Sequence, residues 1–231
     1  MKRIDLKVPF KDKDLAKKLG AWWDPQNKVW FVPEKTNPFR FEKWLPPMID
    51  WSPNIWANHF YIGQASRSCW QCKKSTQVYS FFLDRYELLD FTNGDGDSDP
   101  IMEWTTDPFP SFVYYISRLN QEAMGAIERF TSQYFLSSTK SYSESYYLNH
   151  CEHCGSKQGD FYLFEERSPF SPECTDDIQN LSLYRINQPF YAQGDTVLYN
   201  SFLDEVNIVK LCSKKNRNLK TKKSLFQRLF G

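Results

Sequence analysis

The sequence has almost no excess of charge of either sign. Its 231 residues include 29 lysines and arginines and 28 aspartates and glutamates, a formal net charge of +1. Proteins whose main task is to grip a nucleic-acid backbone normally carry a large basic excess. The composition argues against that class, although it leaves room for a local basic patch.

Long apolar segments are missing as well. No run of about eighteen apolar residues occurs, so no membrane span is expected. The first residues are followed by further charged residues rather than by the apolar core of a secretory signal. The six cysteines are therefore expected to stay reduced, as they would in the cytoplasm.

Motifs of known catalysis are scarce. The chain has no P-loop, no dinucleotide-binding glycine motif, no His-Glu-x-x-His and no Gly-x-Ser-x-Gly. Of its three histidines, His59 has no nucleophile suggested beside it. A catalytic pair of carboxylates remains an alternative, because any fold can bring two carboxylates together. We expect a non-enzymatic protein without a small-molecule substrate.

Cysteine is scarce but closely patterned. Cys69 and Cys72 form one C-x-x-C knuckle, and Cys151 and Cys154 form a second. Two such pairs supply the four thiolates of a tetrahedral zinc site, and four protein ligands leave no position for a reacting water. We therefore predict structural Zn²⁺. A redox pair is the alternative, but neither knuckle opens a helix in a βαβ setting.

The other residues near the knuckles are expected to lie outside the metal's coordination sphere. Four sulfurs already satisfy zinc, so His150 and His153 are expected to be non-ligands. Cys174 and Cys212 are interpreted as free thiols. Strand-like runs at 76–83 and 161–164 follow the knuckles, which is typical of a zinc ribbon. Residues 69–212 would then form a zinc-ribbon domain with an insertion at 73–150.

Residues 1–46 predict a small β-α-β-β domain, so the fold class is α+β. Alternation at 4–9 indicates a strand, and Asp12 is expected to cap a helix over 13–19 that Gly20 ends. Two further strands are expected at 21–24 and 29–33, and a closing helical turn at 39–45.

This segment resembles a known family. The residues that carry the resemblance are Val8-Pro9-Phe10, Lys17-Lys18-Leu19-Gly20-Ala21, Trp23-Asp24 and Lys28-Val29-Trp30-Phe31-Val32-Pro33. They are similar to a small bacterial domain of unknown function that occurs alone and fused to TraC-type plasmid primases and other mobile-element proteins. Residues 151–161 also resemble a zinc-ribbon tail found behind this domain. The resemblance implies association with DNA-processing proteins and transfers no catalytic residue.

Two interpretations compete for the aromatic residues of the small domain. Packing against Leu15 and Leu19 is the usual fate of aromatics at strand spacing, and we expect it for at least two of them. An outward ring such as Trp22 could instead stack on a base, beside the lysines at 17, 18 and 28. The candidate nucleic-acid-binding residues here are Lys17, Lys18, Trp22 and Lys28.

Residues 47–68 are interpreted as a proline-rich connector, with the boundary near residue 50. The insertion behind it begins with an acidic segment. A calcium loop at 93–104 is disfavoured, because Trp104 stands where the closing glutamate belongs. The carboxylates could instead mimic phosphate and enter a basic groove of a partner. The candidate partner-binding residues are Asp95, Asp97, Asp99 and Glu103.

The remainder of the insertion shows the strongest helical periodicity in the chain. Apolar residues recur at three- and four-residue steps from 112 to 134, which predicts a core-facing helix of about twenty residues starting at Pro110. Residues 213–231 form a basic tail, either solvated or a short amphipathic helix. Its candidate nucleic-acid-binding residues are Lys214, Lys215 and Arg217.

The hypothesis that follows is a zinc-stabilised interaction protein. The favoured form is a protein-binding inhibitor, such as an immunity protein that neutralises a basic toxic nuclease. The acidic insertion, the balanced charge and the aromatic content of 17% favour it. The alternative is an accessory nucleic-acid-binding module of a DNA-processing or mobile-element system, suggested by the family resemblance and the basic tail.

Overall fold

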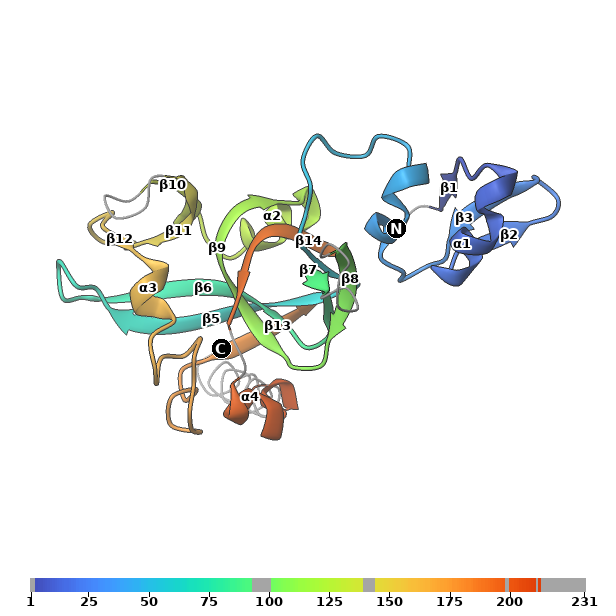
Figure 1. Cartoon of the computed structure of the whole chain (residues 1–231). Helices are drawn as coiled ribbons and strands as arrows, with labels where there is room; N and C mark the ends of the chain where they lie inside the picture. Colours follow the sequence, from blue (N-terminus) through green and yellow to red (C-terminus); the bar gives the residue numbers. More distant parts are fainter. Residues whose placement is uncertain (1–2, 93–100, 139–143, 198–199, 211, 213–231) are drawn as a thin grey trace, which may run out of the picture.

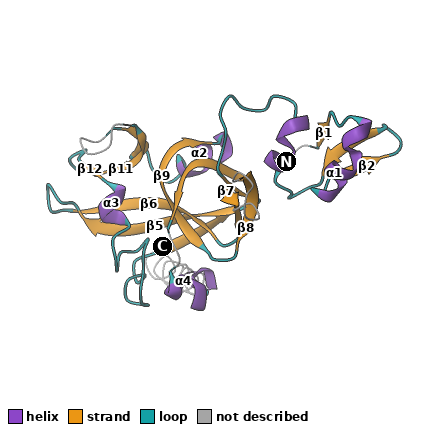
Figure 2. Cartoon of the chain, in the orientation of Figure 1, coloured by secondary structure: helices purple, strands orange, loops and turns teal. Residues whose placement is uncertain are grey.

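A computed structural model describes residues 3–92, 101–138, 144–197, 200–210 and 212. These residues form three antiparallel sheets, and the helices among them are few and short (Figures 1 and 2). The overall class is α+β with β structure dominant. None of the helices in these described parts has the length and hydropathy that a membrane crossing requires.

The N-terminal domain has the predicted β-α-β-β order. Its sheet runs in the order β1-β3-β2 and is flanked by a 3-10 helix, η1, and by α1. The bounds are β1 Ile4–Leu6, η1 Phe10–Asp12, α1 Lys13–Lys18, β2 Trp22–Asp24 and β3 Val29–Val32. Gly20 ends the helix at φ 97°, as expected of a left-handed cap. Leu6, Ala16 and Val32 are buried between sheet and helices.

Asp12 does not cap α1, which corrects the prediction. The side chain makes no capping bond, and η1 runs directly into α1. The carboxylate instead accepts a hydrogen bond from Trp44 Nε1 at 3.1 Å and pairs with Lys43 Nζ at 3.0 Å. Both partners belong to a second 3-10 helix, η2 (Pro38–Trp44), which closes the small core from the other end of the domain.

The second domain is built on an eight-stranded antiparallel sheet in the order β13-β5-β6-β9-β14-β4-β7-β8. The bounds are β4 Ile55–Ala57, β5 Phe60–Ser68, β6 Ser75–Leu83, β7 Tyr86–Thr92, β8 Ile101–Asp107, β9 Ser111–Leu119, β13 Ser182–Ile186 and β14 Phe190–Thr196. Neighbouring residues such as Phe81 and Phe82 are both buried, in separate apolar clusters. The central strands are therefore covered on both faces.

Two predicted boundaries are wrong. The expected connector 47–68 contains β4 and β5, whose apolar residues 55–57 and 60–62 are buried in the sheet. The expected insertion 73–150 supplies β6 to β9, so it forms the body of the domain rather than an addition to it. Local composition could not reveal this, because the pairing partners lie far apart in the chain.

The predicted long helix over 110–134 is also wrong. The segment contains β9, then α2 (Gln121–Ile127), and then β10 (Tyr134–Ser137). Where β9 pairs with β14 the register shifts by two residues, and Tyr115 adopts φ 47°. This bulge places Val113, Ile116 and Leu119 in the same core at three-residue steps, which imitates helical spacing.

A small third sheet carries the second knuckle. Its order is β10-β11-β12, with β11 at Tyr146–His150 and β12 at Lys157–Gln158. The strand expected at 161–164 is instead the short helix α3 (Asp160–Leu163), and α4 spans Ser201–Glu205. β11 lies against β6 through Asn149, whose side chain accepts from Tyr79 N at 2.7 Å and donates to Tyr79 O at 2.9 Å.

The N-terminal domain is fixed to the large sheet by polar and aromatic contacts. Glu87 of β7 accepts hydrogen bonds from Arg40 Nε at 2.7 Å and Asn37 Nδ2 at 2.8 Å. Phe39 stacks on Trp104 of β8 with centroids 6.0 Å apart and meets Tyr191 edge-on at 5.2 Å. The two domains are therefore in direct contact through η2.

Candidate metal centre

The two knuckles occupy equivalent turns in different sheets. The first, Cys69–Cys72, joins β5 to β6, and the second, Cys151–Cys154, joins β11 to β12. In each, the first cysteine N–H donates to the carbonyl five residues on, at 2.9 Å and 2.8 Å. The residue four positions on donates back to that cysteine's carbonyl, at 3.0 Å and 2.8 Å. The two loops share one hydrogen-bond pattern.

That pattern needs a residue with left-handed backbone conformation four positions after the first cysteine of each knuckle. Gly155 fills it in the second knuckle with φ 69°, and Lys73 fills it in the first with φ 61°. Glycine adopts this conformation without a Cβ clash, whereas a lysine is strained by it. The first knuckle is thus formed at a small cost in backbone energy that the second avoids.

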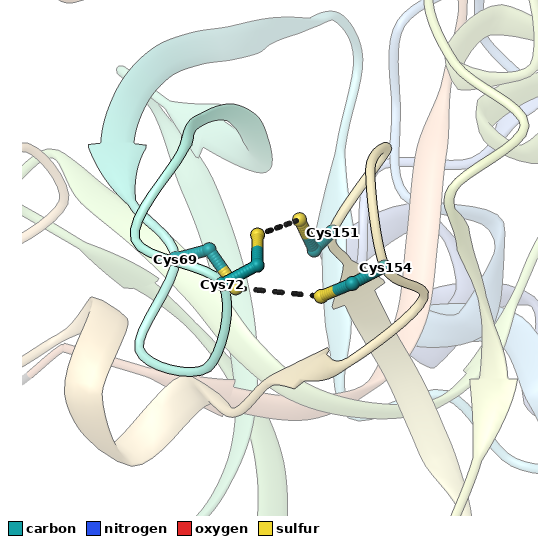
Figure 3. A group of neighbouring side chains, drawn as sticks. All are labelled: Cys69, Cys72, Cys151 and Cys154. Atoms are coloured by element: carbon teal, nitrogen blue, oxygen red, sulfur yellow. Dashed lines mark hydrogen bonds between the residues drawn. The ribbon is translucent and has the colours of Figure 1, made fainter.

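The four sulfurs converge on one point between the knuckles (Figure 3). Cys69 Sγ lies 3.7 Å from Cys154 Sγ, and Cys72 Sγ lies 3.7 Å from Cys151 Sγ. All four sulfurs lie within 4.8 Å of one another. A tetrahedral ion with metal–sulfur bonds of about 2.3 Å requires sulfurs roughly 3.8 Å apart, whereas a disulfide requires about 2.05 Å. The geometry fits a metal ion and not a disulfide.

The pKa values of the thiols reflect how closely the sulfurs interact. Burial raises the pKa of Cys69, but bonds from Ser156 and from the knuckle amides outweigh it and lower that pKa to about 5. A backbone bond from Lys74 lowers the pKa of Cys72, but burial and the neighbouring sulfurs raise it to about 11. Four thiolates this close repel one another, and a divalent cation removes that repulsion.

Further polar groups orient the sulfurs. Ser156 Oγ lies 3.1 Å from Cys69 Sγ, and Gln158 Nε2 donates to the same sulfur at 3.4 Å. The His153 backbone N–H donates to Cys151 Sγ at 3.4 Å. Donors of this kind fix the rotamers of metal ligands and disperse their charge. Sequence reasoning did not single out Ser156 or Gln158, because the first knuckle that they serve lies far away in the chain.

The remaining histidines and cysteines near the knuckles have other contacts. His150 Nδ1 lies 3.1 Å from Leu148 O, and its ring stacks on Phe135. His153 Nε2 lies 2.8 Å from Ser75 O. Cys212 is buried in a core cluster, and Cys174 is a free thiol in a loop. Over the described ranges, the four knuckle cysteines are the group of potential ligands with metal-binding spacing.

The candidate nucleic-acid-binding residues of the N-terminal domain do not lie on one face, because Trp22 is on the sheet and two of the lysines are on the helix. Trp22 is 63% exposed and faces Phe31 on the outer side of the sheet. Lys17 and Lys18 are exposed on α1, which buries Ala16 against the opposite side. Lys28 is exposed in the turn between β2 and β3. The structure therefore pairs Trp22 with Phe31 rather than with the helix lysines.

At least two aromatic residues of this domain were expected to pack against Leu15 and Leu19, and only some of its aromatics lie against the core. Trp30 and Leu19 lie against the small core, whereas Leu15 is exposed. Trp23 is exposed as well, although its ring centroid lies 5.5 Å from that of Trp30.

Of the acidic candidates, Glu103 is exposed on β8 directly opposite Asp90 of β7. Asp95, Asp97 and Asp99 lie outside the described residues, as do Lys214, Lys215 and Arg217. Sequence reasoning also missed a surface beside the knuckles, where Trp70, Phe161 and Tyr162 are exposed. The position of Trp70 between two ligands was the available signal.

Comparison with known proteins assigns only the first domain. Residues 3–46 match the family described as Domain of unknown function (DUF5710). A DNA primase TraC of Escherichia coli is 52% identical over 42 residues, which is 18% of this chain and 4% of that protein. A second DNA primase TraC of Escherichia coli is 51% identical over 39 residues, 17% of this chain and 3% of that protein.

The chain thus spans a small fraction of these relatives' length. No solved structure matches it. The resemblance predicted for the N-terminal segment is confirmed, since residues 3–46 match this family and are similar to a segment of the TraC primases.

Proposed function

We propose that the metal is Zn²⁺ and that its role is structural. The supporting observation is a four-sulfur site whose spacing of 3.7 Å suits zinc–thiolate bonds. Four thiolates fill the coordination sphere, so no position remains for an activated water. Zinc would join the β5–β6 hairpin to the small sheet, and part of the domain's folding energy would be metal-binding energy.

We further propose that the protein is a non-enzymatic accessory module that binds nucleic acid in a DNA-processing or mobile-element system of the bacterial cytoplasm. The observation that carries this proposal is the similarity of residues 3–46 to a segment of DNA primases. The exposed ring of Trp22 supports it, because every base offers a face on which a ring can stack. The basic tail at 213–231 would add phosphate contacts.

The test is binding of a labelled mixed-sequence oligonucleotide at low and moderate salt. Affinity should fall as salt rises, since phosphate contacts release counterions. Removal of residues 213–231 should weaken binding and flatten its salt dependence. A full-length protein, loaded with zinc, that binds no oligonucleotide even at low salt would refute this function.

A protein-binding inhibitor, such as an immunity protein for a toxic nuclease, is the second candidate. It is favoured by the hairpin β7–β8, where Asp90 and Glu103 lie opposite each other and are both exposed. Two exposed carboxylates on one hairpin would suit a basic partner. Affinity capture from the native cell, with and without nuclease, separates the two functions. One stoichiometric partner that survives nuclease and is lost on charge reversal at Asp95, Asp97 and Asp99 would favour the inhibitor.

A further inference from the structure

Three large aromatic side chains are exposed beside the metal centre. Trp70, between the two ligands of the first knuckle, is 57% exposed. Phe161 and Tyr162 of α3 are 70% and 58% exposed. We call these three residues the knuckle aromatic surface. Large exposed aromatics that gather in one place are typical of contact surfaces.

Hydrogen bonds hold the two parts of this surface next to each other. Trp70 Nε1 donates to Lys157 O at 2.8 Å, and Lys157 lies in β12, just before α3. The Arg67 guanidinium of β5 donates to Tyr162 O at 3.2 Å. The rings of Phe161 and Tyr162 meet at right angles with centroids 5.2 Å apart. The first knuckle and α3 therefore form one connected surface.

The fold itself turns the two α3 rings toward solvent. The other two residues of α3, Asp160 and Leu163, are buried. Asp160 Oδ2 accepts a hydrogen bond at 2.9 Å from Tyr115 N, in the bulge of β9, and Leu163 packs in a core cluster. With both ends of this short helix fixed inward, Phe161 and Tyr162 point outward. Their exposure is thus a consequence of the packing and not of a frayed end.

Basic residues lie on the same segments of chain as the aromatic rings. Four basic residues lie on the same knuckle and strands: Arg67, Lys73, Lys74 and Lys157. Lys73 Nζ donates to the carbonyl of Trp70 at 2.6 Å, which places one ammonium at the edge of the surface. The carboxylates on the adjoining segments are Glu152, Glu165 and Glu166. The excess of cations is small, so stacking rather than charge would supply most of the affinity.

We propose that the knuckle aromatic surface is a stacking site for single-stranded nucleic acid. Rings interleaved with lysine and arginine are the combination that binds unpaired bases and their phosphates. A duplex keeps its base faces stacked inside and offers them no such contact. The inference rests on the proposed nucleic-acid function and assigns it a site in the second domain, away from Trp22.

The test compares variants for binding to a labelled single strand of about 20 nucleotides, longer than the roughly 4–16 that one such surface covers. The variants are Trp70→Ala and the double change Phe161→Ala with Tyr162→Ala. Met102→Ala, which shortens another exposed apolar side chain on β8, is the matched control. DNA and RNA strands of the same sequence form separate arms, and a duplex is the competitor. Zinc content and circular dichroism confirm that each variant is folded.

Each aromatic variant is expected to bind the single strand about 5-fold to 100-fold more weakly, since each stacked base contributes on that scale. The salt dependence should stay unchanged, because no charge is removed. Lys157→Ala should instead lower the slope of log K against log salt by about 0.7. Met102→Ala should bind like the unmodified protein.

Two results would overturn the inference, and they differ. If the unmodified protein binds the single strand and the folded double variant binds equally well, the surface is not the site, although the proposed function stands. If the unmodified protein binds no strand at low salt, the proposed function fails and the inference falls with it. Should Trp70→Ala lose zinc, the double variant decides, because the α3 rings carry no metal contact.

Discussion

The two cysteine knuckles have the same loop conformation but belong to very different sheets. The first ends a long hairpin of the eight-stranded sheet, whereas the second lies in a sheet of three short strands. Their backbone hydrogen bonds match, yet only the second has glycine at the left-handed position. The same short motif therefore forms on two unrelated supports, and a metal held by both knuckles would make the two supports depend on each other.

The largest expected effect is that of removing one cysteine ligand from either knuckle. Cys69→Ser and Cys151→Ser should each abolish metal binding, since one thiolate from either knuckle is indispensable to a four-sulfur site. Structural zinc contributes about 10–16 kcal/mol in small metal-folded units, so both variants should unfold the small sheet. Zinc content and hydrogen exchange would measure this. Equal folding without metal would contradict the structural role, and Cys174→Ser is the control.

The buried side chain of Asn149 is a further contact between the two sheets, independent of the metal centre. It pairs with both backbone groups of Tyr79. Asn149→Ala should leave a buried donor and a buried acceptor unpaired, at about 1–3 kcal/mol each. The free energy of unfolding, from denaturant titration with zinc present, should fall accordingly, while metal stoichiometry stays at one. A variant as stable as the unmodified protein would show that the two bonds of Asn149 do not help to hold the sheets together.

The free energy of unfolding is expected to depend on pH through Asp160, which follows the second knuckle in the chain. Burial raises the pKa of Asp160 from 3.8 to about 7, despite the lowering effect of the bond from Tyr115 N. The folded state thus holds a proton that the unfolded state has already released. This contribution to stability is full below about pH 4 and is lost as pH rises through 7. Between pH 6 and 8.5 the loss should be about 1.4 kcal/mol.

Asp160→Asn is the matched variant, because its amide oxygen can still accept from Tyr115 N. Its unfolding free energy should lack this decline over the same pH range, in which zinc stays bound to the thiolates. A parallel decline in both proteins would assign the pH effect to other groups.

The smallest prediction concerns the left-handed positions. Lys73→Gly should relieve backbone strain and stabilise the domain by up to about 1 kcal/mol. Gly155→Ala should cost a similar amount through strain alone, since no atom lies within 4 Å of the added Cβ. Thermal unfolding with saturating zinc would compare the two. If Lys73→Gly raises the unfolding temperature and Gly155→Ala lowers it, the two knuckles are equivalent. If both variants shift the unfolding temperature in the same direction, they are not.

Several features were predictable because their signals are local. The spacing of Cys69, Cys72, Cys151 and Cys154 predicted that these four side chains would lie together, as the structure shows. The β-α-β-β order of the first domain followed from strand alternation, from Gly20 and from turns of a few residues. In such segments the physical causes, backbone conformation and side-chain periodicity, act within one or two turns of chain.

The bulged strand β9 shows why other predictions were wrong. Two extra residues opposite β14 convert a strand's alternation into three-residue steps, and the chain then reads as a helix. Likewise, β4 and β5 follow a run of prolines and were interpreted as a connector. In both cases the deciding interaction is a hydrogen-bond ladder with a strand distant in sequence.

Local sequence was enough to predict that four thiols would meet, because two C-x-x-C turns can satisfy a tetrahedral ion only together. It also predicted the β-α-β-β order of the first domain, although not the bond from Trp44 to Asp12. The place of residues 73–150 in the body of a sheet, and the bonds between Asn149 and Tyr79, follow from the tertiary structure alone. The exposure of the knuckle aromatic surface was decided in the same way. Those outcomes depend on strand pairing and burial over long separations, which no local pattern encodes.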